Sequence, residues 1–200
     1  YFEDIVDEIH IEDNYQNSVQ WDCYKIKAFE ERNDEYCLID GDVILHDRLP
    51  DFNSDVVIDT YEVKNWELEY KPVIEQFTEL GIGDILDGWC DKKKPVFSCG
   101  ILYFKEDKYR KLYVDMWKKY NNFLNEKLQT HKIDVDVATM VGGQYIGTLI
   151  AQKYNLSVEY LSVSLGESGH YYKHHCGILK YRNPIVPKDR IIKIDKKVLL

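Results

Sequence analysis

The chain has 200 residues, of which 44% are hydrophobic and 14% aromatic, and its formal net charge at pH 7 is −9. This length and apolar content suffice for one domain with a substantial core. The acidic charge argues against general affinity for nucleic acids or anionic membranes, which requires a basic surface. No apolar run is long enough to span a bilayer, and no secretory signal opens the sequence. Five cysteines without regular spacing indicate reduced thiols, so we expect a soluble, cytoplasmic protein.

The expected elements alternate between helices and strands, which indicates an α/β layered domain. A helix is expected from Ser18 to about Glu31, and a strand that ends at Asp40 follows it. Further along, we expect a strand at 56–61, a helix that begins at Pro72 and stops before Gly81, a strand at 97–104, helices at 107–125 and 137–154, and a strand at 158–163. The apolar stripe at 107–125 has ordinary helical spacing, which predicts a core face.

The strand that begins at Tyr36 ends in Asp40-Gly41-Asp42, two carboxylates separated by a glycine. An apolar strand is buried in its sheet, so these aspartates should lie at the sheet edge, where open α/β folds bind ligands. Neighbouring carboxylates repel each other, and a divalent ion such as Mn2+ or Mg2+ offsets their charge and can bridge to phosphates. An ordinary turn would also account for the pattern, because Asp and Gly are common turn residues.

A second pattern of this kind, Asp134-Val135-Asp136, precedes the helix expected at 137–154 and does not end an apolar strand. Carboxylates interact favourably with the amino terminus of a helix, which is sufficient to explain this pair. We therefore assign it no metal role.

The segment 170–180 contains three histidines, one cysteine, one glycine and two lysines. One interpretation is a structural zinc site, although zinc normally takes two separated pairs of ligands and the sequence has no clear second pair. Another interpretation makes one imidazole the third ligand of a metal at Asp40 and Asp42. In that case Gly177 allows the backbone to approach a diphosphate, and Lys180 neutralises its charge. A solvated loop without a specific role is the third interpretation.

Taken in order, these motifs resemble those of glycogenin-like, family-8-type glycosyltransferases with the GT-A fold. The resemblance covers about residues 18–184, and its motifs are Asp40-Gly41-Asp42, Phe97-Ser98-Cys99-Gly100-Ile101-Leu102, Gln144 and His174-X-X-Gly177-X-X-Lys180. It implies a single α/β, GT-A-like domain over residues 1–200, with a mixed sheet flanked by helices. It also implies transfer of a sugar, with retention, from a nucleotide-diphosphate donor such as a UDP-sugar. The acceptor hydroxyl would belong to a glycan, a protein or a small molecule.

The resemblance further implies roles for individual residues. Asp40, Asp42 and His174 would be ligands of Mn2+ or Mg2+. Gly177 and Lys180 would lie at the diphosphate of the donor.

Two other residues are candidates by the same resemblance. Gln144 is the expected catalytic residue. Lys25 lies in a segment similar to the helix in which the family places a basic residue near the donor, although an exposed helical lysine is the plain alternative.

The chain departs from the family pattern at three places. Ser98, a further candidate for the donor site, stands where the family has an Asn that often contacts the sugar or acceptor, so the choice of donor is open. Gly143 replaces an acidic residue that assists the reaction in many relatives. Residues 1–17 lack a counterpart of the amino-terminal nucleotide-binding strand, so either about one βαβ unit lies upstream or the nucleotide pocket is remodelled.

These departures support a rival function, a non-catalytic sugar-binding, nucleotide-binding or interaction protein on the same scaffold. A metal-dependent phosphoryl or nucleotidyl transferase is a further alternative, since such enzymes also use paired aspartates. That alternative does not account for the His174-X-X-Gly177-X-X-Lys180 motif.

Overall fold

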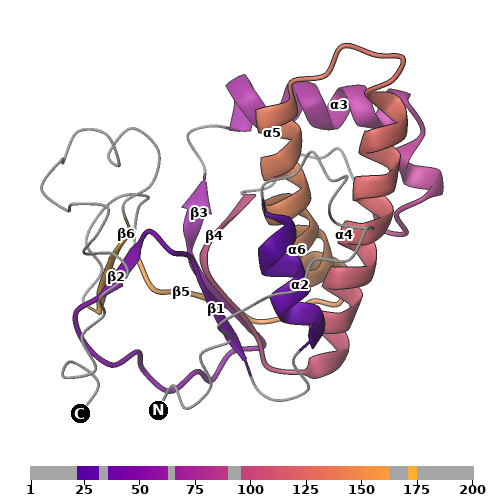
Figure 1. The fold of residues 1–200 in the computed structure, drawn as a ribbon. Coiled ribbons are helices and arrows are strands. Elements are labelled where there is room, and N and C mark those ends of the chain that lie inside the picture. The colour runs from indigo at the N-terminus through magenta and orange to yellow at the C-terminus, as the bar shows by residue number, and fades with distance from the viewer. Residues whose placement is uncertain (1–21, 32–35, 63–65, 90–95, 163–170, 175–200) are drawn as a thin grey trace, which may run out of the picture.

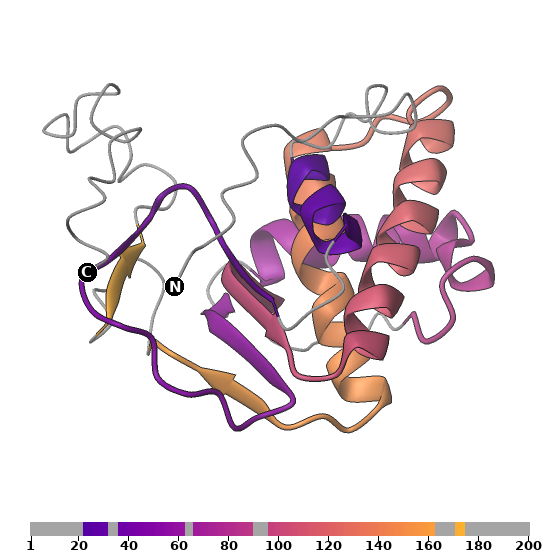
Figure 2. The ribbon, with the colours of Figure 1, turned by 60° about the horizontal axis from the view of Figure 1, so that its bottom comes forward.

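The computed structural model describes residues 22–31, 36–62, 66–89, 96–162 and 171–174. Within these ranges, helices cover one face of a four-stranded mixed sheet, and a separate two-stranded sheet lies away from the helices (Figures 1 and 2). The predicted mixed sheet with flanking helices is therefore confirmed. No helix in the described ranges is both long enough and apolar enough to cross a membrane.

The main sheet has the strand order β1-β4-β3-β5. Strands β1 (Cys37–Ile39) and β3 (Val56–Glu62) pair antiparallel with β4 (Val96–Phe104), whereas β5 (Val158–Tyr160) pairs parallel with β3. All nine residues of β4 are buried, because this strand is paired on both edges and lies beneath helices. The strands expected at 56–61 and 97–104 are confirmed, while β5 ends earlier than the strand expected at 158–163.

The two-stranded sheet joins distant parts of the chain. Strand β2 (Val43–Leu45) follows β1 after a turn and pairs antiparallel with β6 (Tyr172–His174). The register sets Val43 opposite His174. This pairing brings the end of β6 beside the turn that carries the paired aspartates.

The helices on the sheet include α2 (Cys23–Glu31) and α4 (Asp107–Lys127), which confirm two expected helices. The expected start of the first helix at Ser18 lies outside the described residues. A π-helical turn, η1 (Trp66–Tyr70), leads into α3 (Lys71–Glu79), which carries the expected proline in its first turn. Helix α3 lies across one end of α4 (Figure 1).

The chain leaves α3 through a glycine in the left-handed region. Gly81 has a φ of 84° and precedes the 3-10 turn η2 (Ile82–Asp84). Residues other than glycine rarely adopt this backbone conformation, so Gly81 ends α3 as the sequence predicted.

The helix expected at 137–154 consists of three segments. They are α5 (Val135–Met140), the π-helical η3 (Val141–Tyr145) and α6 (Ile146–Lys153). Asp134 caps α5, because its carboxylate accepts a hydrogen bond from the Val137 N–H at 3.1 Å. The cap explains why the helix begins earlier than expected, and it confirms the helix-terminus interpretation of the second Asp-X-Asp. The expectation of one regular helix was wrong, since η3 interrupts it.

The core lies between the main sheet and the helices, and large aromatic side chains fill much of it. The predicted core face of α4 is confirmed, because Leu112 is partly buried against the core and the other six residues of the stripe are buried, namely Tyr109, Tyr113, Met116, Trp117, Tyr120 and Phe123. Cys23 and Cys99 are buried, and Cys37 is half-buried. None of these three described cysteines forms a disulfide.

Candidate metal centre

The turn after β1 contains the paired aspartates. The Val43 N–H donates to the Asp40 carbonyl at 3.0 Å and closes a four-residue turn. The Asp40 N–H donates to the Gly100 carbonyl at 2.9 Å, which ties the turn to β4. The segment is therefore an ordinary turn in its backbone and a carboxylate pair in its side chains, so the two sequence interpretations are compatible.

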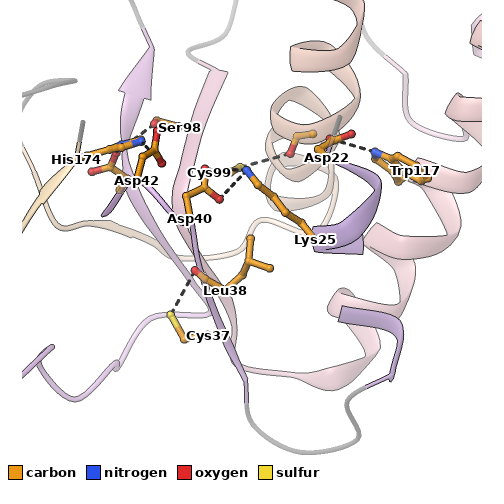
Figure 3. A network of polar contacts seen from close by, with 12 residues as sticks. Asp22, Lys25, Cys37, Leu38, Asp40, Asp42, Ser98, Cys99, Trp117 and His174 are labelled. Atoms are coloured by element: carbon orange, nitrogen blue, oxygen red, sulfur yellow. Dashed lines mark hydrogen bonds and ion pairs between the residues drawn. The ribbon is translucent and has the colours of Figure 1, made fainter. Parts of the chain in front are cut away.

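Asp40, Asp42 and His174, which we call the Asp-Asp-His cluster, are brought together by the pairing of β2 with β6. Each offers one possible ligand atom, and these atoms all lie within 4.8 Å of one another. The Nε2 atom of His174 is 3.5 Å from Asp42 Oδ1. Figure 3 shows His174 and Asp42 side by side, with Asp40 between them and Lys25. The structure thus unites the three residues that the sequence nominated as metal ligands.

Asp59 supports His174 from the other side of the ring. The Nδ1 atom of His174 lies 2.5 Å from Asp59 Oδ2. Asp59 also accepts hydrogen bonds from the hydroxyl of Tyr172 and, at 3.2 Å, from that of Ser98. A carboxylate behind a histidine fixes the ring and turns the other nitrogen toward a metal position. Here that nitrogen is Nε2, which faces Asp42.

The backbone of β3 is irregular where Asp59 leaves it. The register between β3 and β4 shifts between Ile58 and Thr60. Such irregularities commonly re-aim a side chain next to a functional site. Asp59 is an acidic residue inside a mostly apolar strand, and it is only 2% exposed.

Side chains of β4 alternate between the two faces of the sheet, so positions 98 and 100 of the Phe97-Ser98-Cys99-Gly100 motif lie on the same face, beside Asp59. A Cβ atom on Gly100 would lie 2.4 Å from Cε1 of His174 and 3.0 Å from Asp59 Oδ2. Only glycine allows the imidazole to pack this closely against the strand. Ser98 is buried and donates to Asp59 on the same side.

The charge of His174 is set by its acidic neighbours. Burial alone would lower its pKa, but hydrogen bonds to Asp42 and Asp59 outweigh burial and raise the pKa to about 9. At neutral pH the ring is therefore an imidazolium. A metal can bind Nε2 only after that nitrogen has lost its proton, so metal binding here would release a proton.

Lys25 reaches the cluster from α2. Its ammonium nitrogen hydrogen-bonds to Asp40 Oδ2 at 2.7 Å and forms an ion pair with Oδ1 at 2.6 Å. Burial raises the pKa of Asp40, while the charge of Lys25 and its hydrogen bond lower it. The Lys25 side chain is only 25% exposed, so the alternative of a plain exposed lysine is wrong.

Gln144 lies in the π-helical segment η3. The hydroxyl of Tyr70 contacts its Oε1 atom and donates to Glu62 Oε2 at 2.6 Å. Gln144 and Lys25 both line a cavity of about 10 Å³, which is near the lower limit for holding a single water molecule. This cavity connects Gln144 to Lys25, and through Lys25 to Asp40, but it is too small for a sugar ring.

Sequence reasoning missed Asp59, Tyr172 and Asp22. The signal for Asp59 was present, since an acidic residue interrupts the apolar run that begins at Val56. Nothing in the sequence singled out Asp22, a buried carboxylate that lines the same cavity as Gln144.

Two expected diphosphate contacts, Gly177 and Lys180, lie outside the described residues. The other possible zinc ligands of the segment 170–180 also lie outside them. His174 itself is found with carboxylates.

Comparison of the chain with protein-family models, with curated proteins and with solved structures finds no match. The interpretation of the site therefore rests on its residues. Two carboxylates and an imidazole are ligands that Mn2+ accepts readily, and Mg2+ also takes carboxylates. The orientation of Nε2, set by Asp59, suits such an ion.

Proposed function

We propose that this chain is a metal-dependent glycosyltransferase. It moves a sugar from a nucleotide-diphosphate donor, a UDP-sugar, to an acceptor hydroxyl with retention of configuration. One observation carries the proposal: Asp40, Asp42 and His174, which were nominated from separate sequence motifs, have their possible ligand atoms within 4.8 Å of one another. Candidates from separate motifs are thus close enough to bind one ion together.

The support for His174 strengthens the proposal. Asp59 holds the ring through Nδ1, and histidines that bind metals usually donate their second nitrogen to a carboxylate or carbonyl in this way. The Nε2 atom of the same ring is directed at Asp42, another of the candidate ligands.

The proposed roles follow from the charges that the reaction develops. Asp40, Asp42 and His174 hold the divalent ion, which when bound acts as a Lewis acid on the departing diphosphate. Lys25 contributes a second positive charge beside Asp40. Gly177 and Lys180 contact the diphosphate, and Gln144 contacts the reacting sugar or acceptor.

Thermal unfolding with and without ligands tests the proposal. Mn2+ together with a UDP-sugar should raise the melting temperature by several degrees, because a ligand that binds only the folded state stabilises it. Asp42→Ala should abolish this shift. Asp136→Ala is the matched control, since Asp136 belongs to the Asp-X-Asp that begins α5. This control should keep the full shift.

Product analysis separates the competing functions. Incubation with a labelled UDP-sugar and candidate acceptors should release UDP. Pyrophosphate or a phosphorylated product would instead favour a nucleotidyl or phosphoryl transferase. Binding without any product would favour the non-catalytic alternative, and no thermal shift at all would contradict the proposal.

A further inference from the structure

Lys25 engages both carboxylate oxygens of Asp40, one of the proposed metal ligands. Its ammonium lies 2.7 Å from Oδ2 and 2.6 Å from Oδ1. A divalent cation bound to Asp40 would face this ammonium at short range, and like charges repel strongly where they are partly shielded from water. The Lys25 ammonium in its present position therefore opposes binding of a cation at Asp40, and its displacement would favour binding.

Asp22 is a second carboxylate available to Lys25. The two residues are three positions apart at the start of α2, so they lie on the same side of its first turn. Both line the cavity of about 10 Å³. Burial raises the pKa of Asp22 to about 7 against the attraction of Lys25, which is the strongest influence that favours its ionised form.

The carboxylate of Asp22 has an open acceptor position. Its Oδ2 atom accepts a hydrogen bond from Nε1 of Trp117 at 3.2 Å, as Figure 3 shows. Its Oδ1 atom is buried and has no hydrogen-bond partner among the described residues. A buried carboxylate oxygen without a donor is unfavourable. An ammonium that arrived at Oδ1 would remove this cost.

Gly143 provides the space for Asp22. A Cβ atom at position 143 would lie 2.4 Å from Asp22 Oδ2. Any other residue there would push the carboxylate out of its position. The resemblance would put an acidic side chain at position 143. This chain has Gly143 there, and the carboxylate of Asp22, the residue before α2, lies in the space that such a side chain would fill.

We infer that Asp22 is a positioning residue for Lys25, whose ammonium moves from Asp40 to Asp22 when a divalent cation binds Asp40. Gly143 leaves the room in which this exchange takes place. Lys25 stays inside the site and keeps its positive charge near the cation. The inference rests on the proposed metal site, and its test separates the two.

The test is a titration of the full chain with Mn2+ alone, in which electron paramagnetic resonance counts the free ion. Lys25→Gln removes the competing ammonium, so Mn2+ should bind roughly threefold more tightly or better. Asp22→Asn removes the alternative partner of Lys25, so binding should weaken by a similar factor. In the Lys25→Gln background, Asp22→Asn should have little effect.

Gly143→Ala tests the position of the Asp22 carboxylate without removing its charge. The added Cβ displaces Asp22, while Asp22 and Lys25 themselves are both kept. It should weaken Mn2+ binding as Asp22→Asn does, and again only when Lys25 is present. The matched control is Gly83→Ala, whose added Cβ meets nothing within 4 Å. The control should bind Mn2+ as the unaltered chain does.

Equal effects of Asp22→Asn with and without Lys25 would overturn the inference, and so would weaker Mn2+ binding by Lys25→Gln. If circular dichroism shows that Asp22→Asn does not fold, Gly143→Ala in the two backgrounds decides the matter. Failure of the unaltered chain to bind Mn2+ would contradict the proposed metal site itself. Mn2+ binding that does not change in Asp22→Asn would contradict only the role of Asp22.

Discussion

Asp59 and His174 are 115 positions apart in the sequence, yet Asp59 Oδ2 lies 2.5 Å from Nδ1 of His174. Both side chains are buried, with 2% and 7% of their surface exposed. The contact leaves Nε2 of the same ring directed at Asp42. Asp59 therefore orients the ring of the proposed metal ligand and, together with Asp42, raises its pKa.

Asp59→Asn should lower the pKa of His174 from about 9 by roughly one unit or more. The neutral amide no longer stabilises the imidazolium, while burial continues to oppose the charge. Two-dimensional NMR of the His174 ring in the metal-free protein measures this pKa. Tyr172→Phe is the control, since it removes the hydrogen bonds of the Tyr172 hydroxyl to Asp59 and keeps the carboxylate. An unchanged pKa in Asp59→Asn would mean that Asp42 alone holds the charge.

Gly100→Ala should disturb the centre without changing any charge. The added Cβ would lie 2.4 Å from Cε1 of His174, and β4 is buried along its whole length, so the ring must move. We expect a loss of about 1–3 kcal/mol in unfolding free energy and roughly tenfold weaker Mn2+ binding. Urea denaturation and calorimetric titration measure the two effects. Gly83→Ala should change neither, and normal Mn2+ binding by Gly100→Ala would argue that His174 is not a ligand.

Gln144→Ala should lower the rate of sugar transfer without changing the affinity for Mn2+. Gln144 is not one of the three candidate ligands, and its side chain contacts the Tyr70 hydroxyl, which also donates to Glu62. We therefore expect no change in Mn2+ affinity. If Gln144 contacts the reacting groups, kcat should fall roughly tenfold or more. Release of UDP from a UDP-sugar measures the rate. Gln152→Ala, on the exposed side of α6, is the matched control, and equal activity of both variants would remove Gln144 from the proposed site.

Stability should depend on pH through Asp22. The ordinary pKa of an aspartate, which we take for the unfolded chain, is 3.8, whereas the pKa of Asp22 in the folded protein is about 7. The folded state therefore binds this proton more tightly than the unfolded state does. The unfolding free energy therefore falls as pH rises from about 4 to about 7, because ionised Asp22 is poorly accommodated. Asp22→Asn cannot ionise and should lack this loss.

Urea denaturation of both proteins in EDTA, at about pH 4.5 and about pH 8, measures the difference between them. Relative to the unaltered chain, Asp22→Asn should gain stability at the higher pH. A difference that stays constant or reverses would show that Lys25 fully compensates the buried carboxylate.

Local patterns in the sequence were sufficient for most of the elements. Strands β3 and β4 follow from short apolar runs, and helix α4 follows from helical periodicity. Both signals depend only on side chains that are close in the sequence. The paired aspartates after β1 and the cap of α5 are likewise local, since a turn or helix end is made by residues a few positions apart. Even the choice of Asp40, Asp42 and His174 as partners came from motifs and their order.

The tertiary structure decided which residues, distant in the sequence, contact these candidate ligands. Asp59 acquires its role only because the register shift in β3 and the pairing of β2 with β6 bring it to His174. Asp22 acquires its position only because α2 packs where Gly143 has no side chain. Such contacts depend on how whole elements pack, and no local pattern encodes packing between segments that are far apart in the chain. The sequence thus determined the candidate ligands, and the packing decided the charges and hydrogen bonds that surround them.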